Sequence, residues 1–190
     1  MDRRLLAAAA LALLLAGAGC ASLGPGSGEV DRAALAENAT YDWGTDADVT
    51  VNVTGGYYHA VYRVDGRETL AFSRFQRLND RAPLAIGAVA FRYPNGTIVG
   101  SDAVAAEQND THLTVTLPAT EGRFAYRVPM RGKELHVVTA AAGSYEVVLP
   151  PDTRVRYPLL GRVEPGGYER SLEDGRGHLR WAQLTDDRLL

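Results

Sequence analysis

The sequence predicts an all-β protein, an antiparallel β-sandwich of the Ig-like or a related type. Three observations carry this prediction. Apolar and polar residues alternate with a period of two, the alternating stretches are rich in Val, Thr and Tyr, and turn sequences recur about every eight to twelve residues. Only residues 31–38 (DRAALAEN) have helical composition, and they predict one short N-terminal helix.

The first half of the domain contains the clearest strand patterns. Residues 47–53 (ADVTVNV) and 56–64 (GYYHAVYRV) alternate, and Asp65-Gly66 predicts a hairpin turn into residues 67–75. Residues 84–93 (LAIGAVAFRY) are almost continuously apolar, so we expect a central strand covered on both faces. Four of its residues are expected in the core: Leu84, Ile86, Val89 and Phe91.

The second half continues with shorter patterns. Pro94-Asn95-Gly96 predicts a turn into residues 97–101. Alternation then predicts four strands, at residues 111–118, 122–129, 134–141 and 144–150. The remaining stretch contains shorter strands, broken by Pro165-Gly166-Gly167 and by Asp174-Gly175.

The N-terminus has the pattern of an export signal. Arg3 and Arg4 precede an uncharged, mostly Leu and Ala run over residues 5–19, which is shorter than the roughly 20 residues that a membrane-spanning helix needs. The run ends directly before Cys20, the only cysteine. This arrangement resembles the lipobox of prokaryotic lipoproteins, which implies cleavage before Cys20 and lipidation of its thiol. An ordinary secretory signal with an incidental cysteine is the alternative.

These features divide the chain into three parts. Residues 1–19 are expected to be the signal peptide, residues 20–29 a flexible Gly/Ser tether, and residues 30–190 a single sandwich domain. Loss of residues 1–19 removes two of 20 basic and one of 23 acidic side chains, which leaves 18 and 22 and a net charge of −4. A mildly acidic chain of this kind gives no reason to expect a nucleic-acid partner.

Asparagine usage predicts glycosylation. Four of the five asparagines begin an N-x-T sequon, whereas about one in ten would be expected by chance. The predicted sites are Asn38, Asn52, Asn95 and Asn109. The alternative is that Asn-Gly and Asn-Asp favour turns and that Thr favours strands.

Five stretches resemble a known family: ENATYDWGTDADVTVNVTGGYYHAVYRV, FRYPNGTIV, RGKELHV, GSYEVVLPPDTRV and PGGYERSLED. The chain is similar, from residue 29 to about residue 190, to a haloarchaeal surface-lipoprotein family that is known only as a domain of unknown function. The resemblance implies an extracytoplasmic protein anchored to the outer face of the cell membrane. It implies no activity and no catalytic residue.

No pattern in the sequence predicts an enzyme. The four histidines lack metal-pair spacing, a G-x-S-x-G motif is absent, and lipidation would consume the only thiol. We therefore expect no catalytic residues, no metal site and no cofactor. Asp42, Asp46 and Asp48 could share a calcium ion, but they lack the spacing of an EF-hand loop, and a solvated acidic stretch is favoured.

One strand offers a candidate binding face. Alternation places Tyr58, Tyr62 and Val64 on one side of the strand and Tyr57, His59 and Arg63 on the other. We expect the first set in the core, and the second set is the candidate face. The sequence thus predicts a lipid-anchored surface protein with a structural or protein-interaction role. The alternative is a ligand- or glycan-binding lipoprotein. Its expected partners are the membrane, through the lipid, and a protein or glycan of the cell envelope.

Overall fold

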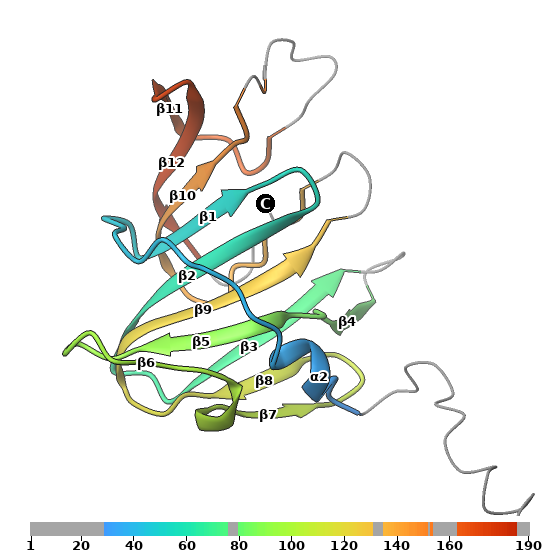
Figure 1. Cartoon of the computed structure of the whole chain (residues 1–190). Coiled ribbons are helices and arrows are strands. Elements are labelled where there is room, and N and C mark those ends of the chain that lie inside the picture. Colours follow the sequence, from blue (N-terminus) through green and yellow to red (C-terminus); the bar gives the residue numbers. More distant parts are fainter. Residues whose placement is uncertain (1–28, 76–79, 131–134, 152, 154–162, 186–190) are drawn as a thin grey trace, which may run out of the picture.

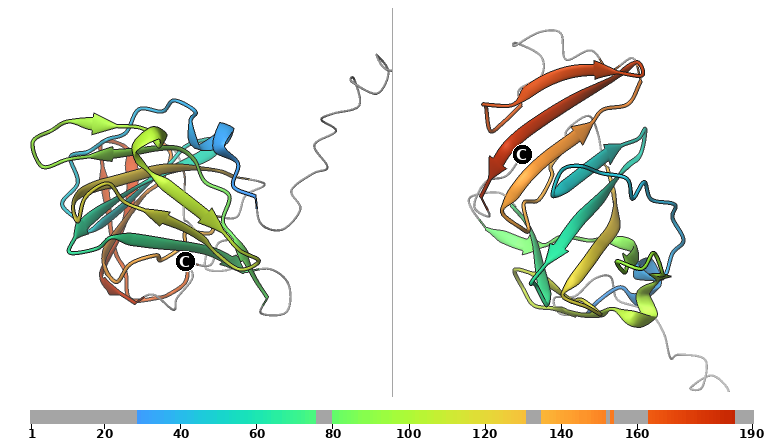
Figure 2. Two further views of the ribbon diagram at one scale, coloured as in Figure 1. Left: turned by 90° about the horizontal axis from the view of Figure 1, so that it is seen from below. Right: turned by 90° about the vertical axis from the view of Figure 1, so that its left-hand side faces the viewer.

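Two β-sheets pack together to form the domain (Figures 1 and 2). The computed structural model describes residues 29–75, 80–130, 135–151, 153 and 163–185. The larger sheet has eight strands in the order β11-β12-β10-β1-β2-β9-β5-β6, and the smaller has four in the order β4-β3-β8-β7. The predicted all-β sandwich is confirmed. The signal peptide, Cys20 and the tether up to residue 28 lie outside the described residues.

The strands follow the predicted alternation closely. In the larger sheet they are β1 (Val49–Val53), β2 (Tyr57–Asp65), β5 (Gly87–Arg92), β6 (Ile98–Val99), β9 (Glu121–Pro129), β10 (Gly143–Val148), β11 (Glu169–Glu173) and β12 (Arg176–Leu184). In the smaller sheet they are β3 (Thr69–Phe75), β4 (Arg81–Pro83), β7 (Ala105–Gln108) and β8 (Leu113–Thr116). The sequence did not predict β4 or β7, because three or four residues are too few to establish a period.

The predicted helix is present but shorter, as α2 (Arg32–Leu35), and a 3-10 turn, η2 (Ser101–Ala103), precedes β7. Asp31 caps α2, because its Oδ1 accepts a hydrogen bond of 3.0 Å from Ala34 N. The helix lies close against β5. A Cβ atom at Gly87 would come within 2.9 Å of Ala34 O, so this contact requires glycine.

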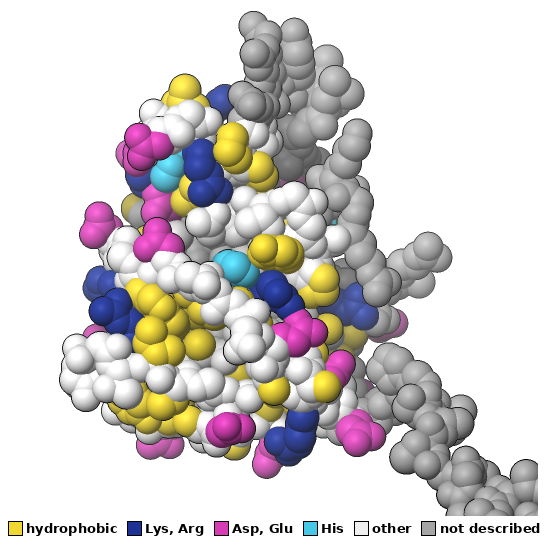
Figure 3. Space-filling model, in the orientation of Figure 1, with side chains coloured by type: hydrophobic (Ala, Val, Ile, Leu, Met, Phe, Trp, Pro, Cys, Tyr) yellow, Lys and Arg dark blue, Asp and Glu magenta, His cyan; other side chains and the backbone are white. Residues whose placement is uncertain are grey.

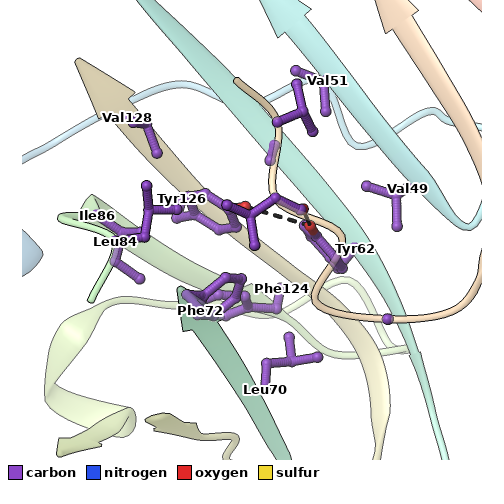
Figure 4. Packing of buried hydrophobic residues seen from close by; sticks show 14 of the residues in the cluster. Val49, Val51, Tyr62, Leu70, Phe72, Leu84, Ile86, Phe124, Tyr126 and Val128 are labelled. Atoms are coloured by element: carbon purple, nitrogen blue, oxygen red, sulfur yellow. Dashed lines mark hydrogen bonds between the residues drawn. The ribbon is translucent and has the colours of Figure 1, made fainter. Parts of the chain in front are cut away.

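Aromatic side chains fill the core between the sheets (Figure 4). Tyr62, Phe72, Phe124 and Tyr126 are all fully buried. The rings of Phe72 and Tyr126 meet edge to face at 4.9 Å, across the interface between the two sheets. The predicted core side of β2 is confirmed, because Tyr58, Tyr62 and Val64 are all buried.

The predicted strand at residues 134–141 is wrong, because residues 135–142 contain no strand. Their apolar side chains, among them Val137 and Val138, are instead buried in the core. Two of their carbonyl groups accept hydrogen bonds from tyrosines: Tyr62 OH donates to Val138 O at 2.6 Å and Tyr145 OH to Ala141 O at 2.5 Å. The apolar pattern of these residues reflects their burial, and a buried loop can have the same pattern as a buried strand.

The Asp65-Gly66 turn does not form the predicted hairpin, because β2 belongs to the larger sheet and β3 to the smaller. The turn carries the chain from one sheet to the other, with Gly66 at φ +66°. The β8–β9 connection crosses beside it, since Gly66 N donates to Thr120 O at 2.9 Å and Leu117 N to Glu68 O at 2.8 Å.

The apolar stretch at residues 84–93 was predicted as a central strand, but β5 is the second strand from one edge of the larger sheet. All four predicted core residues are nevertheless buried, at 6% exposure or less. Apolar residues occur on both sides of this stretch for two reasons. The register of β5 against β9 shifts between Gly87 and Ala90, and residues 39–43 cover the outer face.

One pair departs from the antiparallel pattern: β1 and β10 run parallel, with Val49 opposite Tyr145 and Asn52 opposite Val148. The other strand pairs among the described residues are antiparallel. Two predicted turns are confirmed as hairpins. The Pro94-Asn95-Gly96 turn joins β5 to β6, and Asp174-Gly175 joins β11 to β12 with positive φ at both residues.

Candidate functional site

The outer face of the larger sheet, which points away from the core, is crossed by the extended residues 37–48 (Figure 1). Tyr41 holds this segment down. Its ring packs on Val61 and Ala125, and its hydroxyl donates to Ala88 O. Burial raises the pKa of this hydroxyl, so Tyr41 stays neutral and serves as a structural clamp. The segment divides the outer face into two regions.

On one side of the segment lies a groove of about 630 Å³, which we call the polar groove. Its floor is formed by β1, β2 and β10, one wall by residues 40–46, and the other wall by the β11–β12 hairpin. Figure 3 views this face and shows histidine and charged side chains gathered over it. The floor residues are Thr50, Asn52, His59, Val61, Glu146 and Val148.

An ion-pair network fixes the hairpin wall. The Glu146 carboxylate, whose side chain is only 14% exposed, accepts hydrogen bonds from Arg180 Nε at 2.8 Å and from His178 Nδ1 at 2.9 Å. Arg180 also binds Glu173 with two nitrogens, at 2.6 and 2.9 Å. These bonds, with one from Ser171, lower the pKa of Glu173 to about 2. The wall is therefore preorganised and charged at neutral pH.

Arg176 of β12 links the hairpin wall to the floor of the groove. Its Nε donates to Leu149 O at 2.9 Å, and one terminal nitrogen donates to Asn52 Oδ1 at 2.7 Å. Asn52 is therefore held half-buried on the floor, with its carboxamide oxygen occupied.

Two buried polar atoms of the floor lack a hydrogen-bond partner among the described residues: Thr50 Oγ1 and His59 Nε2. Burial lowers the pKa of His59, so the imidazole is neutral at pH 7. Unsatisfied buried polar atoms are rare in folded proteins and require an explanation. Their position on one groove floor is the feature expected where a bound molecule or an ordered water completes the hydrogen bonding.

A row of rings passes through the groove, where His59 and Tyr41 line it, and ends outside it at Tyr57 and Trp43. Tyr57 stacks on His59 with a centroid separation of 5.0 Å, His59 meets Tyr41 at 4.9 Å, and Tyr41 meets Trp43 at 5.6 Å. At the Tyr57 end of this row, the guanidinium group of Arg127 lies 5.4 Å from the centroid of the Tyr57 ring. Arg127 also forms an ion pair with Glu37. Tyr57 is 37% exposed, so one aromatic surface remains accessible.

The three residues of the predicted binding face do lie on one side of β2, but they do not form one site. Tyr57 and His59 are stacked at the groove, whereas Arg63 lines a different cleft with Arg92 and Arg123. His59 and Arg63 are four residues apart in β2, and four residues of extended strand span about 13 Å, which accounts for this separation. Sequence reasoning missed the groove walls, because residues 40–46 and 173–180 carry no binding motif and are brought to the same groove only by folding.

The four sequon asparagines occupy different environments. Asn38, Asn95 and Asn109 are exposed, and Asn52 is half-buried on the groove floor. Asn95 Oδ1 accepts from Thr97 N at 3.0 Å and Asn109 Oδ1 from Thr111 N at 2.9 Å, so both side chains also stabilise turns. Modification of the four asparagines stays a prediction.

The acidic residues before β1 serve local structure. Asp48 Oδ2 accepts from Ser144 N and Oγ, both at 2.9 Å, and these bonds lower the pKa of Asp48. Asp42 Oδ1 accepts from Gly44 N at 3.0 Å. Within the described ranges, no group of three or more His, Cys, Asp or Glu side chains could hold a metal ion. In the same ranges, no helix has the length and apolarity to span a membrane.

Fold and groove together define the chain as an all-β sandwich domain with a polar, ion-paired groove on the outer face of its larger sheet. Residues 45–190 match a family of unknown function, DUF5803, and the chain belongs to this family. The match confirms the domain of unknown function that the sequence resemblance implied. No curated protein and no solved structure matches the chain.

Proposed function

We propose that this protein is a lipid-anchored, extracytoplasmic binding domain that holds a saccharide of the cell envelope in its polar groove. The surface location rests on the sequence, and the binding role rests on the geometry of the outer face. Of the two roles considered for a surface lipoprotein, ligand binding is better supported by this geometry than a purely structural or protein-interaction role.

The anchoring proposal is supported by the N-terminal pattern. A basic start, an apolar run of 15 residues and a lone Cys20 are followed by Gly- and Ser-rich residues. A lipid on Cys20 would bury methylenes at about 0.8 kcal/mol each. The ten residues of the tether could reach about 35 Å when fully extended, which would hold the domain clear of the membrane surface.

One observation carries the binding proposal: the groove is lined by hydrogen-bonding side chains that ion pairs hold in place, and its floor contains the unsatisfied Thr50 Oγ1 and His59 Nε2. A saccharide presents many hydroxyls, each a donor and an acceptor, and it matches a surface of Asp, Glu, Asn, Arg and His. The exposed Tyr57 ring at the margin offers an apolar surface against which a sugar ring can pack.

Anchoring is tested by fractionation of cells that express Cys20→Ser. The variant is expected in the medium or as an uncleaved precursor, whereas the wild type stays with the membranes. Cys20→Ser protein found cleaved and fully in the membrane fraction would contradict lipid anchoring.

Binding is tested by calorimetric titration of the full chain with neutral oligosaccharides released from the host's cell envelope. Thr50→Val keeps the side-chain shape and Asp174→Asn keeps a residue that tolerates positive φ, so both should fold normally. Each is expected to weaken binding about tenfold, the typical effect of losing a hydrogen bond to a ligand, while the exposed Thr116→Val on β8 binds as the wild type does. Cross-linking on cells that captures a protein, with no saccharide bound in the titration, would instead favour the protein-interaction role.

A further inference from the structure

Three arginines lie side by side across the larger sheet. Arg63 of β2 and Arg92 of β5 both stand directly opposite Arg123 of β9 in the strand register. All three point outward, since their neighbours Val64, Phe91 and Phe124 are buried in the core. Directly opposed side chains have Cβ atoms about 5 Å apart, and like charges at that distance destabilise a sheet.

The positive charge of the three arginines is only partly neutralised by neighbouring residues. Arg63 lies 3.9 Å from the carboxylate of Asp48, and Arg123 donates to the hydroxyl and the carbonyl oxygen of Thr45. Arg92 has no ion pair or hydrogen bond with the residues that the structure describes. Burial and the charges of Arg63 and Arg92 lower the pKa of Arg123, although Asp46 and Asp42 act in the opposite direction.

Arg63, Arg92 and Arg123 line a cleft of about 380 Å³ together with Trp43. Tyr93 also borders this cleft, but its ring packs edge to face on the buried Phe91 at 5.1 Å. This arginine cleft is separate from the polar groove: residues 40–46 run between them, and Trp43 faces the cleft while its neighbours Asp42 and Gly44 face the groove. Guanidinium groups present planar forks of N–H donors that match the geometry of oxyanions. An aromatic ring beside such donors, here that of Trp43, provides a flat apolar surface.

We propose that the arginine cleft binds an acidic sugar, with its carboxylate or sulfate group on the arginines and its ring against Trp43. The anion would supply the negative charge that the arginine row lacks, and the Trp43 ring distinguishes a sugar acid from a free inorganic anion. The proposal stands independently of the polar groove and of the lipid anchor, because it rests on other residues.

The test is calorimetric titration of the full chain at constant ionic strength with glucuronate, glucose 6-sulfate, glucose, acetate and inorganic sulfate. Both acidic sugars are expected to bind saturably, with Kd at least tenfold lower than that of glucose, acetate or sulfate. Acetate or sulfate binding as tightly as glucuronate would overturn the assignment to a sugar. Absence of saturable binding by all five would overturn the site.

Variants locate the binding. Arg63→Gln and Arg92→Gln are each expected to raise the Kd for glucuronate at least fivefold, and Arg92→Lys, which keeps the charge but not the fork, to have a smaller effect. Arg74→Gln, at an exposed position near the end of β3, is the matched control and should bind normally. The groove variant Asp174→Asn should also bind glucuronate normally, so failure of the groove proposal and failure of this one are distinguishable. Equal loss in Arg74→Gln and Arg92→Gln would show general charge attraction and overturn the proposal.

Discussion

Glu146 of β10 stands directly opposite Arg180 of β12, and Arg180 Nε donates to Glu146 Oε1 at 2.8 Å. The same carboxylate oxygen accepts from His178 Nδ1 at 2.9 Å. One carboxylate on the floor of the groove therefore fixes two side chains of its wall, and this arrangement couples the shape of the groove to the pairing of β10 with β12.

Glu146→Gln should lower the free energy of unfolding by about 1–3 kcal/mol, because it leaves two donors with a weaker acceptor. Urea unfolding at pH 7 measures this loss. Glu173→Gln, which removes an exposed partner of the same arginine, is the comparison and should cost less. A larger loss for Glu173→Gln than for Glu146→Gln would contradict the central position of Glu146.

Acid stability should depend on Glu173. Its pKa in the folded protein is lowered to about 2 by hydrogen bonds from Arg180 and Ser171, whereas an unfolded chain has a Glu pKa of about 4.3. A group whose pKa is depressed by folding contributes stability that is present above its unfolded pKa and lost as the pH falls toward its folded pKa. Between about pH 5 and pH 2, the urea midpoint of Glu173→Gln should therefore fall less steeply than that of the wild type. Parallel curves for the two proteins would refute this linkage.

Tyr62→Phe tests how residues 135–142 are held. The change removes the hydrogen bond from Tyr62 OH to Val138 O and leaves a buried carbonyl without this donor. We expect a loss of about 1–2 kcal/mol in the free energy of unfolding and faster amide hydrogen exchange over residues 135–142. Tyr57→Phe, at an exposed ring on the same strand, should leave both quantities unchanged.

Glycosylation should follow the accessibility of the four asparagines. Asn38, Asn95 and Asn109 are exposed, whereas Asn52 accepts a hydrogen bond from Arg176 on the groove floor. The intact mass of protein from its native host is expected to exceed that of the lipidated chain and to fall stepwise in Asn95→Gln and Asn109→Gln. Asn52→Gln should leave the mass of the attached glycans unchanged. A mass equal to that of the lipidated polypeptide would leave the N-x-T matches as turn chemistry.

Local chemistry in the sequence determined much of the secondary structure. Alternation separates the buried Tyr58, Tyr62 and Val64 from the outward Tyr57, His59 and Arg63, because side chains of a strand point to opposite faces in turn. The turn residues Asp174 and Gly175 close a hairpin because both adopt positive φ. These features depend on neighbours within a few residues, which the sequence displays directly.

Only the tertiary structure decided which strands pair and which side chains meet. The Asp65-Gly66 turn leads into the other sheet, and β1 pairs in parallel with a strand almost a hundred residues away. Val137, Val138 and Ala141 are buried although residues 135–142 form no strand. The polar groove and the arginine cleft likewise join side chains from separate strands. The period of a strand records which face is buried but carries no information about its partner, because pairing is set by packing between residues far apart in the chain.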